Sequence, residues 1–101
     1  MQRRRMKRIP DSKRFSIIHD MKSCYFCGSV PVEIHECFHG TANRQKSIKY
    51  GLCMGLCRMH HQAAHNDHSF DLVIKRLGKE AFMKEHTEEE FLKIFGRSYE
   101  T

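Results

Sequence analysis

The chain of 101 residues lacks tryptophan, has only two prolines and contains no long apolar segment. No window approaches the roughly 18 apolar residues of a membrane-spanning helix. The basic N-terminal stretch is not followed by the apolar run that a secretory signal peptide requires. Internal repeats and low-complexity segments are absent as well. We therefore expect a cytoplasmic protein that has no membrane partner.

A disulfide framework is disfavoured, because five cysteines are an odd number in a chain expected in the reducing cytoplasm. Eight histidines accompany them, and cysteine and histidine at short spacings are typical of metal binding. The length predicts one domain, over residues 15–101. A domain of this size buries only about two thirds of its unfolded surface, so a bound metal would add materially to its stability.

Positive charge is concentrated in the first two thirds of the chain. Residues 1–65 contain 12 Lys and Arg against 4 Asp and Glu, whereas residues 66–101 contain 6 against 8. Seven basic residues lie in residues 1–14, which we expect to form a flexible basic arm able to lie along phosphates. The excess predicts a polyanionic partner, most simply DNA or RNA, although the same charge would also serve solubility alone.

Hydrophobic spacing and turn residues predict a small α+β domain. Its expected elements, in chain order, are a strand at 30–38, a loop or short helix at 40–51, a strand at 52–56, a helix opening at 57, helical runs at 70–77 and 79–86, and a helix at 88–95. Thr41 is the expected N-cap of the segment at 40–51, and Gly51 is its expected terminator.

The C-terminal third is expected to consist of helices alone, over residues 69–96. Gly78 is expected to end the first of them. Thr87 begins a capping box with Glu90, which predicts the start of the last helix. We interpret the apolar stripe of residues 70–96 as core that carries no chemistry, so the functional part of the domain is expected at residues 24–67.

Two pairs of metal-binding residues stand at ligand spacing. They are Cys24 and Cys27, in a CxxC turn followed by glycine, and Cys57 and His60, at the start of the predicted helix. Two such pairs suit a tetrahedral structural Zn²⁺. We interpret the remaining Cys37 and Cys53 as small core residues. The CxxC pair alone would also fit a thiol redox site, but that reading leaves Cys57 and His60 unexplained.

A second set of histidines predicts another metal site. His61 and His65 lie four residues apart and share one helical face, and His61 diverges from the adjacent His60. His35, on the strand at 30–38, would complete a three-ligand site. Three protein ligands with open positions are typical of a catalytic metal. The alternative is that the helical histidines are ordinary surface residues.

The motifs combine into a pattern that covers roughly residues 24–65. It reads Cys24-x-x-Cys27-Gly28, His35-Glu36-x-Phe38, Gly40-Thr41, Asn43-Arg44, Ser47, Gly51-Leu52 and Leu56-Cys57-x-x-His60-His61. The pattern resembles the HNH (ββα-metal) endonuclease superfamily, in particular the small phage and prophage HNH-like proteins related to the recombination-enhancement nuclease Ref. As a combination the pattern is specific, although each piece alone is weak.

The resemblance implies a ββα core that binds one divalent metal and hydrolyses phosphodiester bonds, most simply in DNA, in the cytoplasm of a phage host or bacterium. It implies that His35, His61 and His65 hold the catalytic ion, which could be Mg²⁺, Mn²⁺, Ni²⁺ or Zn²⁺. The cysteine-containing pairs take the structural zinc position. Where the family has its base histidine this chain has Glu36, so that Glu36, His35 and His39 are alternative bases.

Arg44, on a basic loop with Lys46 and Lys49, is the expected ligand of a neighbouring phosphate. The alternative for Arg44 is a solvated loop charge. Because Glu36 stands at the position of the base, a second function stays open. In that interpretation the chain is a catalytically inactive zinc-binding module that binds nucleic acid or inhibits a host protein.

Overall fold

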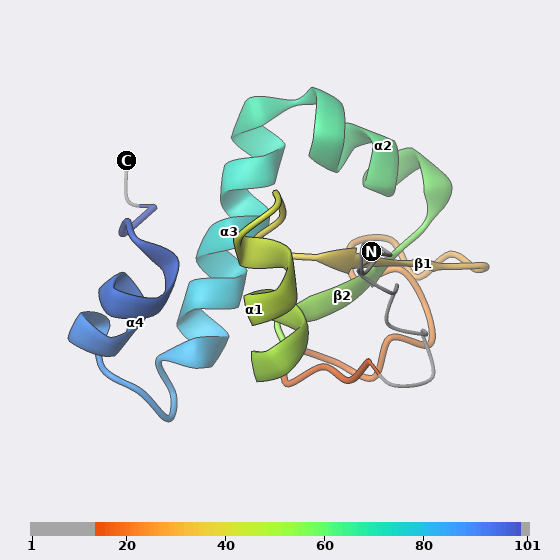
Figure 1. Cartoon of the computed structure of the whole chain (residues 1–101). Coiled ribbons are helices and arrows are strands. Elements are labelled where there is room, and N and C mark those ends of the chain that lie inside the picture. Colours follow the sequence, from red (N-terminus) through yellow and green to blue (C-terminus); the bar gives the residue numbers. More distant parts are fainter. Residues whose placement is uncertain (1–13, 100–101) are drawn as a thin grey trace, which may run out of the picture.

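The computed structural model describes residues 14–99, and the first 13 residues of the predicted basic arm lie outside this range. The described chain forms an α+β fold with one two-stranded sheet and four helices (Figure 1). The elements are β1 (Glu33–Glu36), α1 (Asn43–Tyr50), β2 (Cys53–Leu56), α2 (Arg58–Asn66), α3 (His68–Phe82) and α4 (Glu88–Phe95). None of these helices is long and apolar enough to cross a membrane.

The two strands pair in antiparallel fashion, with His35 opposite Met54 and Glu36 opposite Cys53. Every residue of β2 is buried, so this strand lies inside the fold. Helix α1 fills the connection between the strands and ends at Gly51, whose φ of 73° lies in the left-handed region. The predicted terminator is therefore confirmed.

Helix α2 begins directly after β2, as predicted, because Cys57 serves as its N-cap in an extended conformation. The helix packs against both strands and against α3. Figure 1 shows α2 lying over the sheet, with α3 leading from its end toward α4. This arrangement places the first turns of α2 beside the side chains of β1.

Helix α3 is continuous through Gly78, so the expectation of two helical runs separated by this glycine was wrong. The glycine serves close packing instead. A Cβ atom at this position would lie 2.9 Å from Cβ of Cys37 and 3.0 Å from Cε2 of Phe38. Glycine marks helix ends and close backbone contacts alike, and the sequence did not distinguish the two.

Helix α4 has the predicted capping box. The backbone N–H of Glu90 donates to Oγ1 of Thr87 at 3.1 Å, and the backbone N–H of Thr87 donates to Oε1 of Glu90 at 2.8 Å. From this helix Phe91 and Phe95 pack on Phe38, with ring centroids 5.4 Å and 4.6 Å away. The last helix is thereby attached to the end of β1.

Two further expectations are corrected at element boundaries. Each strand has only four residues, so both are shorter than the predicted ranges of 30–38 and 52–56, since only these residues pair across the sheet. The segment at 40–51 does contain a helix. Its N-cap, however, is Ala42, which makes no side-chain capping bond, rather than Thr41.

Replacing Gly78 by alanine is expected to destabilise the fold by about 1–2 kcal/mol, because the added methyl group overpacks the contact with Cys37 and Phe38. This net value includes the gain of about 1 kcal/mol in helix propensity. Urea unfolding followed by circular dichroism measures the change. Glu80→Ala, at an exposed position of the same helix, should alter stability by about 0.5 kcal/mol or less. A Gly78→Ala protein as stable as the wild type would contradict the close contact.

Candidate functional site

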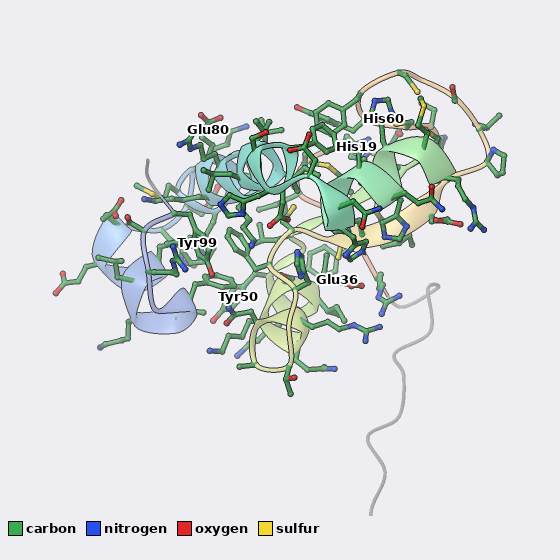
Figure 2. The ribbon with its side chains drawn as sticks, turned by 90° about the horizontal axis from the view of Figure 1, so that it is seen from above. His19, Glu36, Tyr50, His60, Glu80 and Tyr99 are labelled. Carbon is green, nitrogen blue, oxygen red and sulfur yellow. The ribbon has the colours of Figure 1, made fainter. Side chains whose placement is uncertain are left out.

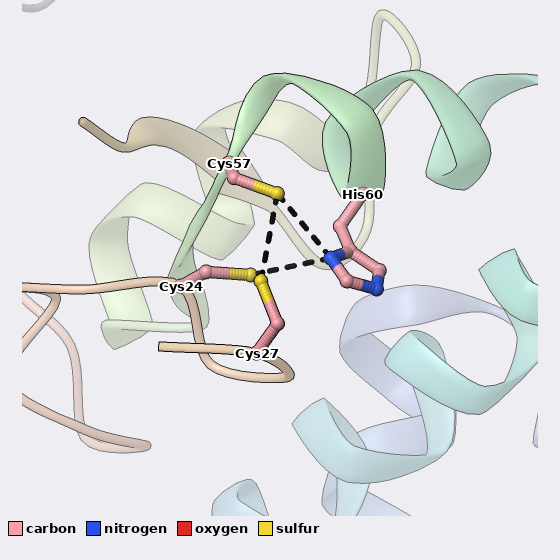
Figure 3. Close-up of side chains that lie close together, drawn as sticks. All are labelled: Cys24, Cys27, Cys57 and His60. Carbon is pink, nitrogen blue, oxygen red and sulfur yellow. Dashed lines mark hydrogen bonds between the residues drawn. The ribbon is translucent and has the colours of Figure 1, made fainter. Parts of the chain in front are cut away.

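Cys24, Cys27, Cys57 and His60 converge from two segments that are far apart in the sequence (Figure 3). Nδ1 of His60 lies 3.5 Å from the sulfur of Cys24 and 3.3 Å from that of Cys57. The sulfurs of Cys27 and Cys57 are 3.8 Å apart. A tetrahedral zinc with bonds of about 2.0–2.3 Å sets its ligand atoms roughly 3.3–3.8 Å from one another. This set can therefore hold a metal ion such as zinc.

Strand β2 positions both halves of this cysteine cluster. In the first half, the N–H of Gly28 donates to the carbonyl of Cys24 at 2.8 Å and closes a tight turn. The N–H of Tyr25 donates to the carbonyl of Gly55 at 2.9 Å and ties the turn to β2. The second half follows directly, because Cys57 is the residue after the strand. The cluster is thus built around the end of one buried strand.

The thiols of the cluster are unequal. Burial acts to raise the pKa of Cys24, but hydrogen bonds from backbone N–H groups outweigh it and lower the value to about 6. A backbone hydrogen bond at His60 acts to lower the pKa of Cys57, but burial and the neighbouring thiols hold it above its ordinary value. Ionisation of the first thiol is therefore favoured, and the negative charge of that thiolate opposes ionisation of a second thiol. A divalent cation removes that opposition, which fits the cluster to a metal.

His35, His61 and His65 form a second cluster. Their ligand nitrogens lie within 4.8 Å of one another, and their ring centroids are 5.1–5.2 Å apart. His35 is only 2% exposed, and its Nε2 is buried without a hydrogen-bond partner. Burial, reinforced by the nearby His61, lowers the pKa of His35 to about 3, so the ring is a neutral nitrogen donor. This donor set fits a divalent metal ion.

Glu33 supports this histidine cluster from the same face of β1 as His35. Its Oε1 accepts a hydrogen bond of 2.7 Å from Nδ1 of His61, and this bond lowers the pKa of Glu33. With Nδ1 engaged, His61 has its Nε2 left for the cluster, an arrangement common among metal-binding histidines. Glu33 was not singled out from the sequence. Its alternation with His35 along the strand was the one available signal.

A pocket of about 610 Å³ opens beside the histidine cluster, between β1, the loop after it, α1 and α2. Glu36 pairs with Arg14 at 3.2 Å and with Arg44 at 3.5 Å in its wall. The predicted catalytic residues His35, Glu36 and Arg44 thus line one pocket. Arg14 is only 7% exposed, so it belongs to the folded domain and not to the predicted arm of residues 1–14. The side chain of Arg44, in contrast, is 46% exposed.

Asp71 contacts the pocket residue His39 from α3, a helix that was expected to carry no chemistry. Its Oδ1 accepts a hydrogen bond of 3.0 Å from Nε2 of His39, and its Oδ2 accepts one of 2.7 Å from Lys75. Burial acts to raise the pKa of Asp71, but the bonds from Lys75 and His39 outweigh it and hold the pKa below its ordinary value. His35, His39 and Asp71 form a third group of closely placed ligand atoms. No spacing in the sequence connects residues 39 and 71.

The two remaining cysteines lie outside these clusters. Cys37 and Cys53 are both fully buried and form no disulfide. Burial raises the pKa of both thiols, to about 12 for Cys53. Both are therefore uncharged core residues, which confirms their interpretation from the sequence.

Comparisons with protein-family models, with curated proteins and with solved structures find no match. The resemblance to HNH endonucleases accordingly stays a prediction that the sequence motifs carry. The features that bear on function are therefore the two metal-compatible clusters and the pocket beside the histidine cluster.

Cys24→Ser is expected to remove one tightly bound metal ion per chain and to lower the thermal midpoint, because a structural metal contributes directly to folding. Plasma mass spectrometry of the purified protein counts the ions, and circular dichroism follows the melting. Cys53→Ala is the control, since it removes a buried thiol that lies outside the cluster. A Cys24→Ser protein with the metal content of the control would contradict metal binding at the cysteine cluster.

Glu33→Gln is expected to weaken divalent metal binding at the histidine cluster by about 10–100-fold, because the carboxylate that orients His61 is lost. Titration calorimetry with Mn²⁺, on protein whose cysteine cluster is already loaded with zinc, measures the affinity. Glu80→Gln makes the same chemical change at an exposed site on α3 and should bind Mn²⁺ as the wild type does. Equal affinities of the two variants would show that Glu33 has no part in the site.

Proposed function

We propose that this protein is a metal-dependent endonuclease of the HNH type that hydrolyses phosphodiester bonds in DNA, encoded by a phage or mobile element. One observation carries the proposal: the buried, neutral His35 meets His61 and His65 at the wall of an arginine-lined pocket. Three nitrogen ligands beside an open space are typical of a catalytic metal site. The basic excess of residues 1–65 supports a polyanionic substrate.

The two metal-compatible clusters have separate roles in this proposal. Zinc at the cysteine cluster is structural, since its four protein ligands leave no open position. The histidine cluster holds Mg²⁺, Mn²⁺, Ni²⁺ or Zn²⁺, which when bound supplies positive charge to the phosphate in the transition state. His65 is exposed whereas His35 is buried, so the cluster faces solvent on the side of α2. The substrate would approach from that side.

Arg44 is the residue we assign to the phosphate. Arg44 is the second residue of α1, and it lines the pocket with nearly half of its side chain exposed. A guanidinium can donate two parallel hydrogen bonds to phosphate oxygens, which fixes the group as well as neutralising its charge. Its contact with Glu36 is long, at 3.5 Å, and leaves the guanidinium room to engage a substrate.

Glu36 is better suited to holding the arginines than to accepting a proton. Its two carboxylate oxygens face different guanidiniums, those of Arg14 and Arg44. The side chain is only 12% exposed, and Figure 2 shows Glu36 near the middle of the molecule, away from Glu80 on α3. This arrangement favours a role for Glu36 in positioning Arg44, so the base is to be sought elsewhere in the pocket.

The ion pairs of Glu36 with the two arginines also favour the second candidate function. In that function the chain binds nucleic acid or a host protein and catalyses no hydrolysis. In that case the cysteine cluster would still bind zinc, and the pocket would serve as an anion site. The two functions differ in one measurable respect. The nuclease requires an ion at the histidine cluster, whereas the binding module does not.

Nicking of supercoiled plasmid DNA in the presence of Mg²⁺, Mn²⁺ or Ni²⁺ tests the nuclease. The wild type should convert supercoiled to open-circular DNA, and His61→Ala should lower the rate by at least about 100-fold through loss of the metal. Arg44→Ala should retain metal and lose about 10–100-fold in rate, since one charged hydrogen-bonding group is removed. Gel electrophoresis over a time course gives the rates.

Glu80→Gln is again the matched control and should nick at the wild-type rate. Absence of nicking by the wild type with all three metals would overturn the enzymatic proposal. Retained binding of the same DNA in a gel-shift assay would then favour the binding module.

A further inference from the structure

We propose that Asp71 positions His39 as the proton acceptor for the attacking water, so that the active site extends onto α3. The inference rests on the hydrolytic function proposed above. In this inference His39 and Asp71 perform the proton transfer for which Glu36 is poorly placed. It also gives α3, which contributes nothing to the sequence motif, a direct part in the chemistry.

The contact between the two side chains determines which nitrogen of His39 carries the proton. Asp71 forms an ion pair with Lys75, whose Nζ donates to Oδ2 at 2.7 Å, and an ionised carboxylate only accepts hydrogen bonds. Nε2 of His39 must therefore donate to Oδ1 of Asp71 across the 3.0 Å contact. A neutral imidazole with its proton on Nε2 has an acceptor lone pair on Nδ1. Asp71 thus selects the tautomer that can take up a proton at Nδ1.

His39 also lies where a base is needed. Its ring lines the pocket and lies 5.6 Å from the ring of His35 and 5.3 Å from that of His65, centroid to centroid. One third of its side chain, 33%, is exposed, so a water molecule in the pocket can reach it. The ring of His39 is therefore an immediate neighbour of two of the three histidines of the metal-compatible cluster.

The same geometry argues against the alternative that His39 and Asp71 bind a second cation with His35. The ammonium group of Lys75 lies 2.7 Å from Oδ2 of Asp71 and already balances its charge. A divalent ion beside this pair would meet the positive charge of Lys75 at close range. The network of Lys75, Asp71 and His39 is complete as a chain of hydrogen bonds, and it ends at the pocket.

The proposed step is a hydrolysis in which the water oxygen forms a new bond to phosphorus with its lone pair. The proton of this water passes to Nδ1 of His39. The bond from phosphorus to the leaving 3′ oxygen breaks, its electron pair stays on that oxygen, and the oxygen takes a proton from solvent. His39 later returns its proton to solvent, so the step requires no further reactant.

The tautomer of His39 gives a test that does not depend on activity. Long-range ¹H–¹⁵N correlation spectra of the zinc- and magnesium-loaded protein should show His39 with its proton on Nε2. In Asp71→Asn the amide can donate to Nε2, so the spectrum should shift toward the Nδ1-protonated form. A wild-type His39 with its proton on Nδ1 would overturn the inference whatever the activity of the protein.

Plasmid nicking then tests the catalytic role. His39→Ala should lower kcat by about 10²–10⁴-fold, with metal content and KM nearly unchanged, and added imidazole should restore part of the rate. Asp71→Asn should lower kcat by at least about 10-fold. If Asp71 acts through His39, the double variant should be no slower than His39→Ala alone. The exposed Glu80→Gln on the same helix is the control.

The outcomes separate this inference from the proposed function. A wild type that nicks DNA while His39→Ala nicks equally well overturns the role of the pair and leaves the nuclease standing. Loss of a metal ion from His39→Ala would make His39 a ligand and would also overturn the inference. A wild type that never nicks overturns the nuclease and the catalytic role together. Because His39 is partly exposed, its alanine variant keeps the proposal testable even where Asp71→Asn does not fold.

Discussion

The end of β2 is the constraint on which both clusters depend. The turn that carries Cys24 is fastened to this strand by the hydrogen bond from Tyr25 to Gly55, and Cys57 leaves the same strand to begin α2. The cysteine cluster therefore fixes the direction in which α2 starts. Every residue further along that helix takes its position from this start, including the histidines that face the pocket.

Two adjacent residues divide the helix between the two clusters. His60 turns its Nδ1 toward the sulfurs, whereas His61 turns its Nδ1 toward Glu33 on β1. Neighbouring helical side chains point about 100° apart, so one residue can serve each side. A metal at the cysteine cluster would thus hold the helix from one side while the strand holds it from the other. The rotation of α2 about its axis is set by both contacts together.

Much of this arrangement was predictable, because short spacings translate directly into geometry. The CxxC and CxxH pairs, the helical pair His61 and His65, and the capping box of α4 are local patterns, and each appears where it was expected. Neither Arg14 in the pocket wall nor the contact of Asp71 with the pocket residue His39 was predicted. Their contacts join segments far apart in the chain, and no local pattern encodes such a distance. The prediction that Gly78 ends a helix failed for a different reason. A glycine that ends a helix and a glycine that allows close packing look alike in sequence.

The close approach at Gly78 has a bearing on the pocket as well as on the packing of α3. There the backbone of the helix lies against Cys37, the residue that follows β1, so the helix cannot move closer to the end of this strand without a clash. Asp71 lies seven residues earlier, about two turns or roughly 10 Å along the same axis. The close contact at Gly78 therefore also fixes where the carboxylate of Asp71 lies along and around the axis of α3. The accuracy with which an acidic group is presented to His39 is therefore governed by a position that bears no side chain at all.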